Sequence, residues 1–116
     1  MIQRFEEDHR MAQIVVAGGF FETAGQVSLA DGIQNQTRQA LLQIDTLLAK
    51  INADKSNITR MQIWLADMKG DFALMNEIYD AWIKDSPKPA RVCVGADFLD
   101  GYKIEIQAFG YLGNTK

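Results

Sequence analysis

The longest regular pattern of apolar and polar positions lies between residues 31 and 51. Its apolar or small side chains recur at steps of three and four residues, at Thr37, Ala40, Leu41, Ile44, Leu47, Leu48 and Ile51. This period predicts an α-helix with one apolar stripe. Asp31 followed by Gln34 is typical of a capping box, in which side chains bond the backbone of the first turn. We therefore expect a helix that starts after Asp31 and buries one face.

A second helical pattern follows Asp71, which is expected to cap it. Its apolar face is formed by Phe72, Met75, Tyr79 and Trp82. Pro87 and Pro89 are expected to stop the helix, because proline lacks a backbone N–H. The aromatic and methionine positions of this helix indicate core packing.

Two short strands are predicted on either side of Gly18-Gly19, a dipeptide that favours a tight turn. A further strand is expected before them, at residues 2–6. The segment 56–67 alternates in the manner of a half-buried strand. One of its faces carries Thr59, Met61, Ile63 and Leu65, and the other carries Ile58, Arg60, Gln62 and Trp64.

Two more strands are expected at about residues 90–96 and 102–112. Asp100-Gly101 lies between them and is a strong hairpin signal, so the local pattern predicts that these two strands pair. The predicted order is strand, strand, helix, strand, helix, strand, strand, with the further strand at the start.

Two amphipathic helices can cover only one face of a sheet of five or six strands. The other face would carry charged and aromatic side chains together, at Arg60, Gln62, Trp64, Lys103, Glu105, Gln107, Phe109 and Tyr111. Such a mixture suits a subunit interface better than open solvent. We therefore expect an α+β domain that forms an oligomer.

The chain has 116 residues, the size of one domain, and a formal net charge of −3. Its lysines and arginines form no basic stripe, so nucleic acid is not an expected partner. No apolar run approaches the ~20 residues that span a bilayer, and the first residues do not resemble a secretory signal. The single cysteine fits a reducing compartment. We expect a cytoplasmic protein without a membrane partner.

Arg91 stands in an otherwise apolar run, residues 88–96. Burying a guanidinium without a partner costs several kcal/mol, so Arg91 needs an anion. Its planar fork matches a carboxylate in a bidentate manner. That carboxylate belongs either to Glu105, on the polar side of the last strand, or to a ligand. The residues alone leave both possibilities open.

Other candidate chemistry is less well supported. Cys93 lies two residues from Arg91 and on the same strand face, but no histidine lies in its segment, which favours a small buried thiol over a nucleophile. His9 follows three acidic residues without a recognised metal-ligand spacing, so a solvated acidic turn is favoured. The segment 17–25 lacks the Lys-Ser/Thr ending of a phosphate-binding loop. These patterns indicate neither a metal site nor a phosphate-binding loop.

Several segments together are similar to one known family. They are Gly25-Gln26 and residues 36–51, 58–72, 72–82, 89–94 and 102–108. This combination resembles the RidA/YjgF family of reactive-intermediate deaminases, and the resemblance runs from about residue 10 to residue 112. It implies a chorismate-mutase-like α+β fold as a single domain over residues 1–116, assembled into homotrimers with ligand clefts between subunits. It also implies the strand order 1-2-3-6-4-5, in which the last two strands do not pair.

Members of that family hydrolyse 2-imino acids and their enamine tautomers to 2-keto acids and ammonia, so the resemblance implies this activity here. This chemistry requires neither a metal nor an organic cofactor, and we expect none. Arg91 resembles the arginine that holds the substrate carboxylate, and Glu105 resembles the acidic group that positions or activates the attacking water. Cys93 and Asn76 resemble residues that line the cleft.

Two positions depart from the family pattern. Met11 stands where active deaminases carry a tyrosine, and Ala24 replaces a serine. Two hydroxyls expected around the substrate are therefore absent, and Met11 should make its wall of the cleft more apolar. The alternative function is a trimeric sensor that binds small carboxylates, such as 2-keto acids, without turning them over. The acidic balance of the chain gives no physical reason to prefer RNA as a substrate.

Overall fold

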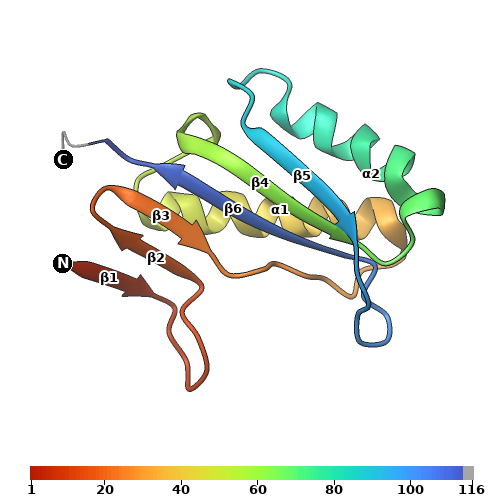
Figure 1. Ribbon diagram of the computed structural model, residues 1–116, viewed down its shortest axis with the longest axis horizontal. Coiled ribbons are helices and arrows are strands. Elements are labelled where there is room, and N and C mark those ends of the chain that lie inside the picture. Colours follow the sequence, from red (N-terminus) through yellow and green to blue (C-terminus); the bar gives the residue numbers. More distant parts are fainter. Residues whose placement is uncertain (114–116) are drawn as a thin grey trace.

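Two helices pack against one face of a six-stranded sheet in the computed structural model of the chain, which describes residues 1–113 (Figure 1). The elements are β1 (Ile2–Phe5), β2 (Ile14–Ala17), β3 (Phe20–Thr23), α1 (Gly32–Lys50), a short 3₁₀ turn (Lys55–Asn57), β4 (Ile58–Leu65), α2 (Met68–Ile83), β5 (Ala90–Gly95) and β6 (Ile104–Tyr111). The expected α+β class and element order are confirmed, including the additional first strand.

The strand order is β1-β2-β3-β6-β4-β5, with β4 and β5 parallel and the other neighbours antiparallel. At the turn between β2 and β3, Gly18 and Gly19 have φ angles of 57° and 83°, as a tight hairpin requires. Glycine adopts such angles without a steric penalty. The Gly18-Gly19 hairpin is therefore confirmed.

The predicted pairing of the last two strands through Asp100-Gly101 is wrong. The chain does turn there, because the Tyr102 N–H donates to the Leu99 carbonyl at 3.2 Å. It then passes the end of β4, where the Ala66 N–H donates to the Lys103 carbonyl, and enters the sheet on the far side of β4. The helical crossover from β4 through α2 places β5 parallel to β4, which leaves the other edge of β4 for β6.

The core lies between the helices and the central strands. The predicted stripe of α1 is confirmed, because every one of its positions is buried. It packs over fully buried side chains of β4 and β6, namely Met61, Ile63, Leu65, Ile104, Ile106 and Ala108. No helix within residues 1–113 is long and apolar enough to cross a membrane.

Helix α1 begins after Asp31, as predicted, but without the predicted capping box, and helix α2 begins earlier than predicted. Asp31 is the residue before α1, but its side chain makes no capping hydrogen bond, and the Gln34 amide donates instead to Glu77 of α2 at 3.1 Å. A contact between helices therefore replaces the capping box. Helix α2 begins at Met68, so its cap is Asp67, whose Oδ1 accepts from the Gly70 N–H at 3.0 Å, and not Asp71.

Two apolar positions also differ. Ile58 is buried and Thr59 is exposed, because the register of β4 against β6 shifts between Ile58 and Arg60. Phe72 lies at the start of α2 with 39% of its surface exposed, whereas Met75, Tyr79 and Ile83 are buried. The buried face of α2 therefore runs from Met75 to its last turn.

No other element of residues 1–113 covers the sheet face opposite the helices, as the pattern predicted; we call it the open face. Its central pairs are Arg60 with Phe109, Gln62 with Gln107 and Trp64 with Glu105. The Arg60 guanidinium lies 3.9 Å from the centroid of the Phe109 ring. Exposed apolar side chains continue this face on both sides of those pairs, at Phe20, Tyr111, Val92 and Val94.

Gly110 provides a test of how β6 packs against its neighbours. A Cβ at Gly110 would overlap the Asn57 carbonyl oxygen and the Phe21 ring. We expect Gly110→Ala to lower the free energy of unfolding by about 1–3 kcal/mol, because a backbone atom cannot move aside easily. The control is Gly95→Ala, whose nearest contacts would be the flexible Met68 side chain at 3.3 Å and the Leu65 carbonyl at 3.8 Å. Equal stability of the two variants in urea unfolding would contradict the described β6 packing.

Candidate functional site

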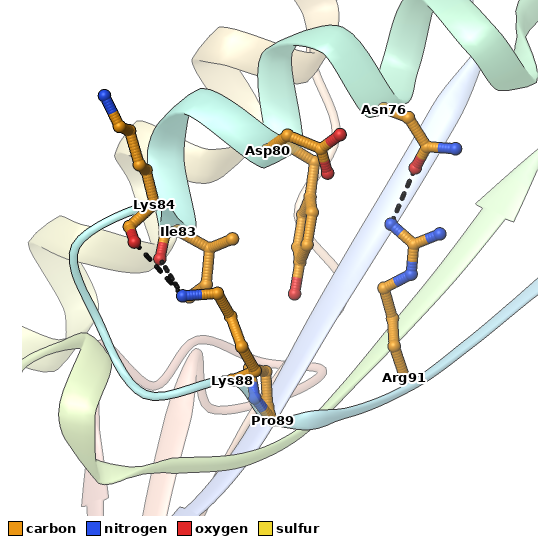
Figure 2. Close-up of a pocket in the computed structure, with 8 residues that line it drawn as sticks. Asn76, Asp80, Ile83, Lys84, Lys88, Pro89 and Arg91 are labelled. Atoms are coloured by element: carbon orange, nitrogen blue, oxygen red, sulfur yellow. Dashed lines mark hydrogen bonds between the residues drawn. The ribbon is translucent and has the colours of Figure 1, made fainter.

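Arg91 lies on the edge strand β5 and points toward the helices. In the parallel pairing Arg91 stands beside Met61, and Cys93 stands beside Ile63. Met61 and Ile63 are buried under the helices. The Arg91 Nη1 donates to Asn76 Oδ1 of α2 at 2.7 Å, a contact that Figure 2 shows. The guanidinium carbon lies 4.8 Å from the centroid of the Tyr79 ring. Helix α2 therefore holds the guanidinium through two side chains.

A groove of about 540 Å³ opens at this guanidinium, between α2 and the start of β5. We call it the Arg91 groove; its lining residues are Asn76, Tyr79, Asp80, Ile83, Lys84, Lys88, Pro89 and Arg91 (Figure 2). The Lys88 ammonium donates to the carbonyls of Ile83, Lys84 and Ser86 at 3.2, 3.1 and 2.6 Å. An ammonium has three N–H donors, so Lys88 is fully used at the end of α2.

The Arg91 guanidinium, in contrast, has donors left for a ligand. A guanidinium has five N–H donors, and Asn76 takes one of them. Among residues 1–113 the ion pairs are Lys50 with Glu6 and Lys55 with Asp45, and neither includes Arg91. The ion pair between Arg91 and Glu105 is therefore not formed within the described part of the chain.

Glu105 lies on the opposite side of the sheet from Arg91. It stands beside Trp64 on the open face, between the buried Ile104 and Ile106. A Cβ on Gly25 would overlap the Glu105 carboxylate, so the glycine permits this close approach. Gln26 holds the segment against β6 through two backbone hydrogen bonds with Ile106, at 2.7 and 3.0 Å.

Ala24 and Met11 belong to the N-terminal side of the molecule. Ala24 immediately follows β3, and its N–H donates to the Gln13 carbonyl at 2.8 Å. Met11 is exposed in the loop between β1 and β2. The N–H groups of Met11 and Arg10 donate to the Asp8 carboxylate, and these bonds hold the pKa of Asp8 below its ordinary value.

The site residues inferred from the sequence thus fall into separate groups. Arg91, Cys93 and Asn76 lie together between β5 and α2, on the covered side of the sheet. Glu105 and the Ala24-Gly25 segment lie together at β6, and Met11 lies in the β1–β2 loop. One chain does not bring Arg91 and Glu105 to the same face.

No group of three or more His, Cys, Asp and Glu side chains that could hold a metal ion occurs within residues 1–113.

Comparison with known proteins identifies the family. The sequence model of the family described as Endoribonuclease L-PSP matches residues 1–112. A RutC family protein of Haemophilus influenzae is 38% identical over 109 residues, which make up 90% of this chain and 93% of the relative. The chain belongs to the RidA/YjgF family. Another family relative, the RutC family protein YoaB of Escherichia coli K12, is 35% identical over 108 residues and covers 91% of this chain and 94% of its own length.

Solved structures agree with this family assignment. The crystal structure of a YjgF family member from Neisseria meningitidis superposes with a TM-score of 0.93 at 32% identity, and the match covers 99% of this chain and 98% of the other. The strand order expected of the RidA/YjgF family is also the order that the sheet adopts.

Tyr79 is a residue of the Arg91 groove that the sequence pattern assigned only to the core. It is buried, but it also lines the Arg91 groove and stacks on the guanidinium. Asn76 and Tyr79 are three residues apart in α2, so they share one side of the helix. That spacing was the sequence signal that could have placed Tyr79 beside Asn76. Burial raises the pKa of Tyr79, Arg91 opposes the rise, and Asp80 adds to it.

Cys93 is partly buried, and its Sγ lies 3.9 Å from the Met68 Sδ. Burial raises the pKa of its thiol, and the nearby Arg91 guanidinium opposes this only in part. The thiolate, which is the nucleophilic form, is therefore disfavoured at neutral pH. This agrees with the prediction of an inert thiol, which lies beside Arg91 but does not line the Arg91 groove.

The reactivity of Cys93 tests this description. We expect iodoacetamide to alkylate Cys93 more slowly than free cysteine at pH 7.5, with a rate that rises until the pH exceeds the ordinary thiol pKa. Labelling is unambiguous because the chain has one cysteine. Mass spectrometry of time points measures the rate. Alkylation faster than that of free cysteine at pH 7.5 would show an activated thiolate and contradict this assignment.

Proposed function

We propose that this protein hydrolyses small 2-imino acids and their enamine tautomers to 2-keto acids and ammonia, in a cleft completed by a neighbouring subunit. The observation that carries the proposal is the Arg91 guanidinium. It lines an open groove, is oriented by Asn76 and Tyr79, and has no carboxylate partner within residues 1–113. A positive group held in this way is suited to the carboxylate of a substrate.

The chemistry needs few groups. The carbon of a protonated imine is already electrophilic, so the protein must fix the substrate and present a water molecule. Arg91 would bind the carboxylate. The Glu105 carboxylate would accept a proton from the water as its oxygen bonds to C2, giving a carbinolamine. Return of that proton to the nitrogen lets the C–N bond break, and loss of the hydroxyl proton leaves the keto acid and an ammonium ion.

The separation of Arg91 and Glu105 supports a site shared between subunits. The sheet stands between them in one chain, so a Glu105 that serves a substrate on Arg91 belongs to a second copy. The open face supports association, because large apolar side chains are exposed on it, including Phe20 at 62% and Val92 at 43%. We propose the homotrimer of the family. A cytoplasmic location is part of the proposal and is supported by the single cysteine.

A second candidate function is a trimeric sensor that binds small carboxylates without turnover. It uses the same arginine, and the side chains of Met11 and Ala24 favour it because neither supplies a hydroxyl. Saturable binding of 2-oxobutyrate with no acceleration of imine decay would select this function.

Two substitutions test the hydrolase. We expect Arg91→Ala to abolish detectable binding of 2-oxobutyrate and to leave the oligomer intact, because no ion pair within residues 1–113 is lost. Glu105→Gln should keep binding and slow hydrolysis by roughly 100-fold or more, the usual effect of losing a general base. A dehydratase generates 2-iminobutyrate in place, and its decay is followed by trapping the imine.

The matched control is Arg38→Ala, which removes an exposed arginine on α1 that bonds Asn35. It should leave binding and hydrolysis unchanged. Unfolding or dissociation of the Arg91→Ala variant would show that the guanidinium has a structural role and would contradict its assignment to the site. A wild-type protein that accelerates no imine across several side chains would rule out the hydrolase.

Association through the open face is tested by placing a carboxylate on it. We expect the wild-type protein to sediment as three chains and Phe20→Asp to sediment as a smaller species, because burial of an unpaired charge is costly. Leu42→Asp is the control, since Leu42 is similarly exposed, at 55%, but lies on α1. Sedimentation of the wild type as a monomer, or dissociation of Leu42→Asp alone, would contradict the proposed interface.

A further inference from the structure

The hydroxyl of Tyr79 has no hydrogen-bond partner among residues 1–113, although the residue is only 5% exposed. Within the same residues, no side-chain oxygen or nitrogen is both sealed from solvent and unpartnered. The Tyr79 hydroxyl must therefore reach an opening, and the opening that Tyr79 lines is the Arg91 groove. A phenol hydroxyl that faces a groove and makes no hydrogen bond within residues 1–113 is available to donate to a bound molecule.

The neighbouring polar groups form a set of donors. The Asn76 Oδ1 accepts from Arg91, which leaves the Asn76 Nδ2 and its two N–H donors without a partner in residues 1–113. The Lys88 ammonium is fully used by backbone carbonyls. Figure 2 shows the Lys84 ammonium directed away from the Arg91 guanidinium. Arg91, Asn76 and Tyr79 are therefore the donors that remain for a ligand in the groove.

We propose that the Tyr79 hydroxyl donates a hydrogen bond to the ligand carboxylate that Arg91 holds, with the Asn76 Nδ2 as a further donor. A carboxylate is an acceptor only and has about four lone-pair positions. The guanidinium fork takes two of them, and Tyr79 and Asn76 match the others. This inference rests on the carboxylate binding of the proposed function, but not on turnover.

The environment of Tyr79 suits a donor. Burial raises its pKa, so the phenol keeps its proton at neutral pH and can donate to an anion. The ring also stacks on the guanidinium, which fixes the hydroxyl relative to Arg91. Tyr79 would thus supply a hydroxyl from α2 at a site where Met11 and Ala24 supply none.

The test is Tyr79→Phe, which keeps the ring, its burial and its stacking on Arg91 and removes the hydroxyl alone. The probes are butyrate and 2-oxobutyrate, whose dissociation constants are measured by ligand NMR titration at neutral pH. We expect Tyr79→Phe to weaken both probes by about tenfold, since a hydrogen bond to a charged group is lost. The melting temperature of the free protein should not fall, because the hydroxyl has no partner within residues 1–113.

Tyr102→Phe is the matched control, because it removes a phenol hydroxyl that does not line the groove; it should leave both constants unchanged. Unchanged binding in Tyr79→Phe would overturn the proposal. Weakening of 2-oxobutyrate alone would also overturn it, because the hydroxyl would then contact the C2 oxygen. A lower melting temperature with both constants unaltered would make Tyr79 a structural residue only.

This inference and the proposed function can fail separately. Suppose that the wild-type protein binds both acids and hydrolyses no imine, and that Arg91→Ala binds neither acid. This result would contradict the hydrolase, and the dissociation constants of Tyr79→Phe would still decide the role of Tyr79. A protein that hydrolyses imines and binds both acids equally well in Tyr79→Phe would contradict only the role of Tyr79.

Discussion

The pairing of β4 with β5 on one edge and β6 on the other decides on which side of the sheet Arg91 and Glu105 lie. Met61 stands beside Arg91, and Trp64 stands beside Glu105. Residues three apart on a strand point to opposite faces, so the guanidinium and the carboxylate are placed on opposite sides of the sheet. A slip of one residue in either pairing would reverse this, but the buried Ile104, Ile106 and Ala108 fix the register of β6.

The proposed contact between copies of the chain would account for two features that are otherwise unrelated. The open face exposes Phe20, Val92 and Val94, and the Arg91 groove has a guanidinium without a carboxylate within residues 1–113. Such a contact would cover the open face and bring Glu105 of a second copy to the Arg91 groove. Helix α2 contributes differently, because Asn76 and Tyr79 already hold Arg91, which would reduce the ordering that the proposed ligand binding requires.

Much of the fold follows from local patterns, and the exceptions have identifiable causes. The stripe of α1 and the Gly18-Gly19 turn depend on neighbours in sequence, and both were predictable. The Asp100-Gly101 hairpin was wrong because turn chemistry does not reveal which strands pair at long range. The prediction of a capping box at α1 was wrong because the Gln34 amide donates to Glu77 of the other helix. The strand order came from the family resemblance, not from the pattern.

The site was predictable in composition but not in arrangement. Arg91 stands out as a charge in an apolar run, yet its side of the sheet depends on the register with β4. The sequence pattern does not distinguish Tyr79 from other buried aromatic residues, whereas the structure shows that its hydroxyl has no hydrogen-bond partner in the described residues 1–113. The most direct measurement mixes equal amounts of unfolded Arg91→Ala and Glu105→Gln chains, refolds them together and assays imine hydrolysis. If each site takes Arg91 and Glu105 from different subunits, about one quarter of the sites regain both groups, and activity returns to that fraction of wild type. Activity no higher than that of the separate variants would mean that both groups serve within one chain.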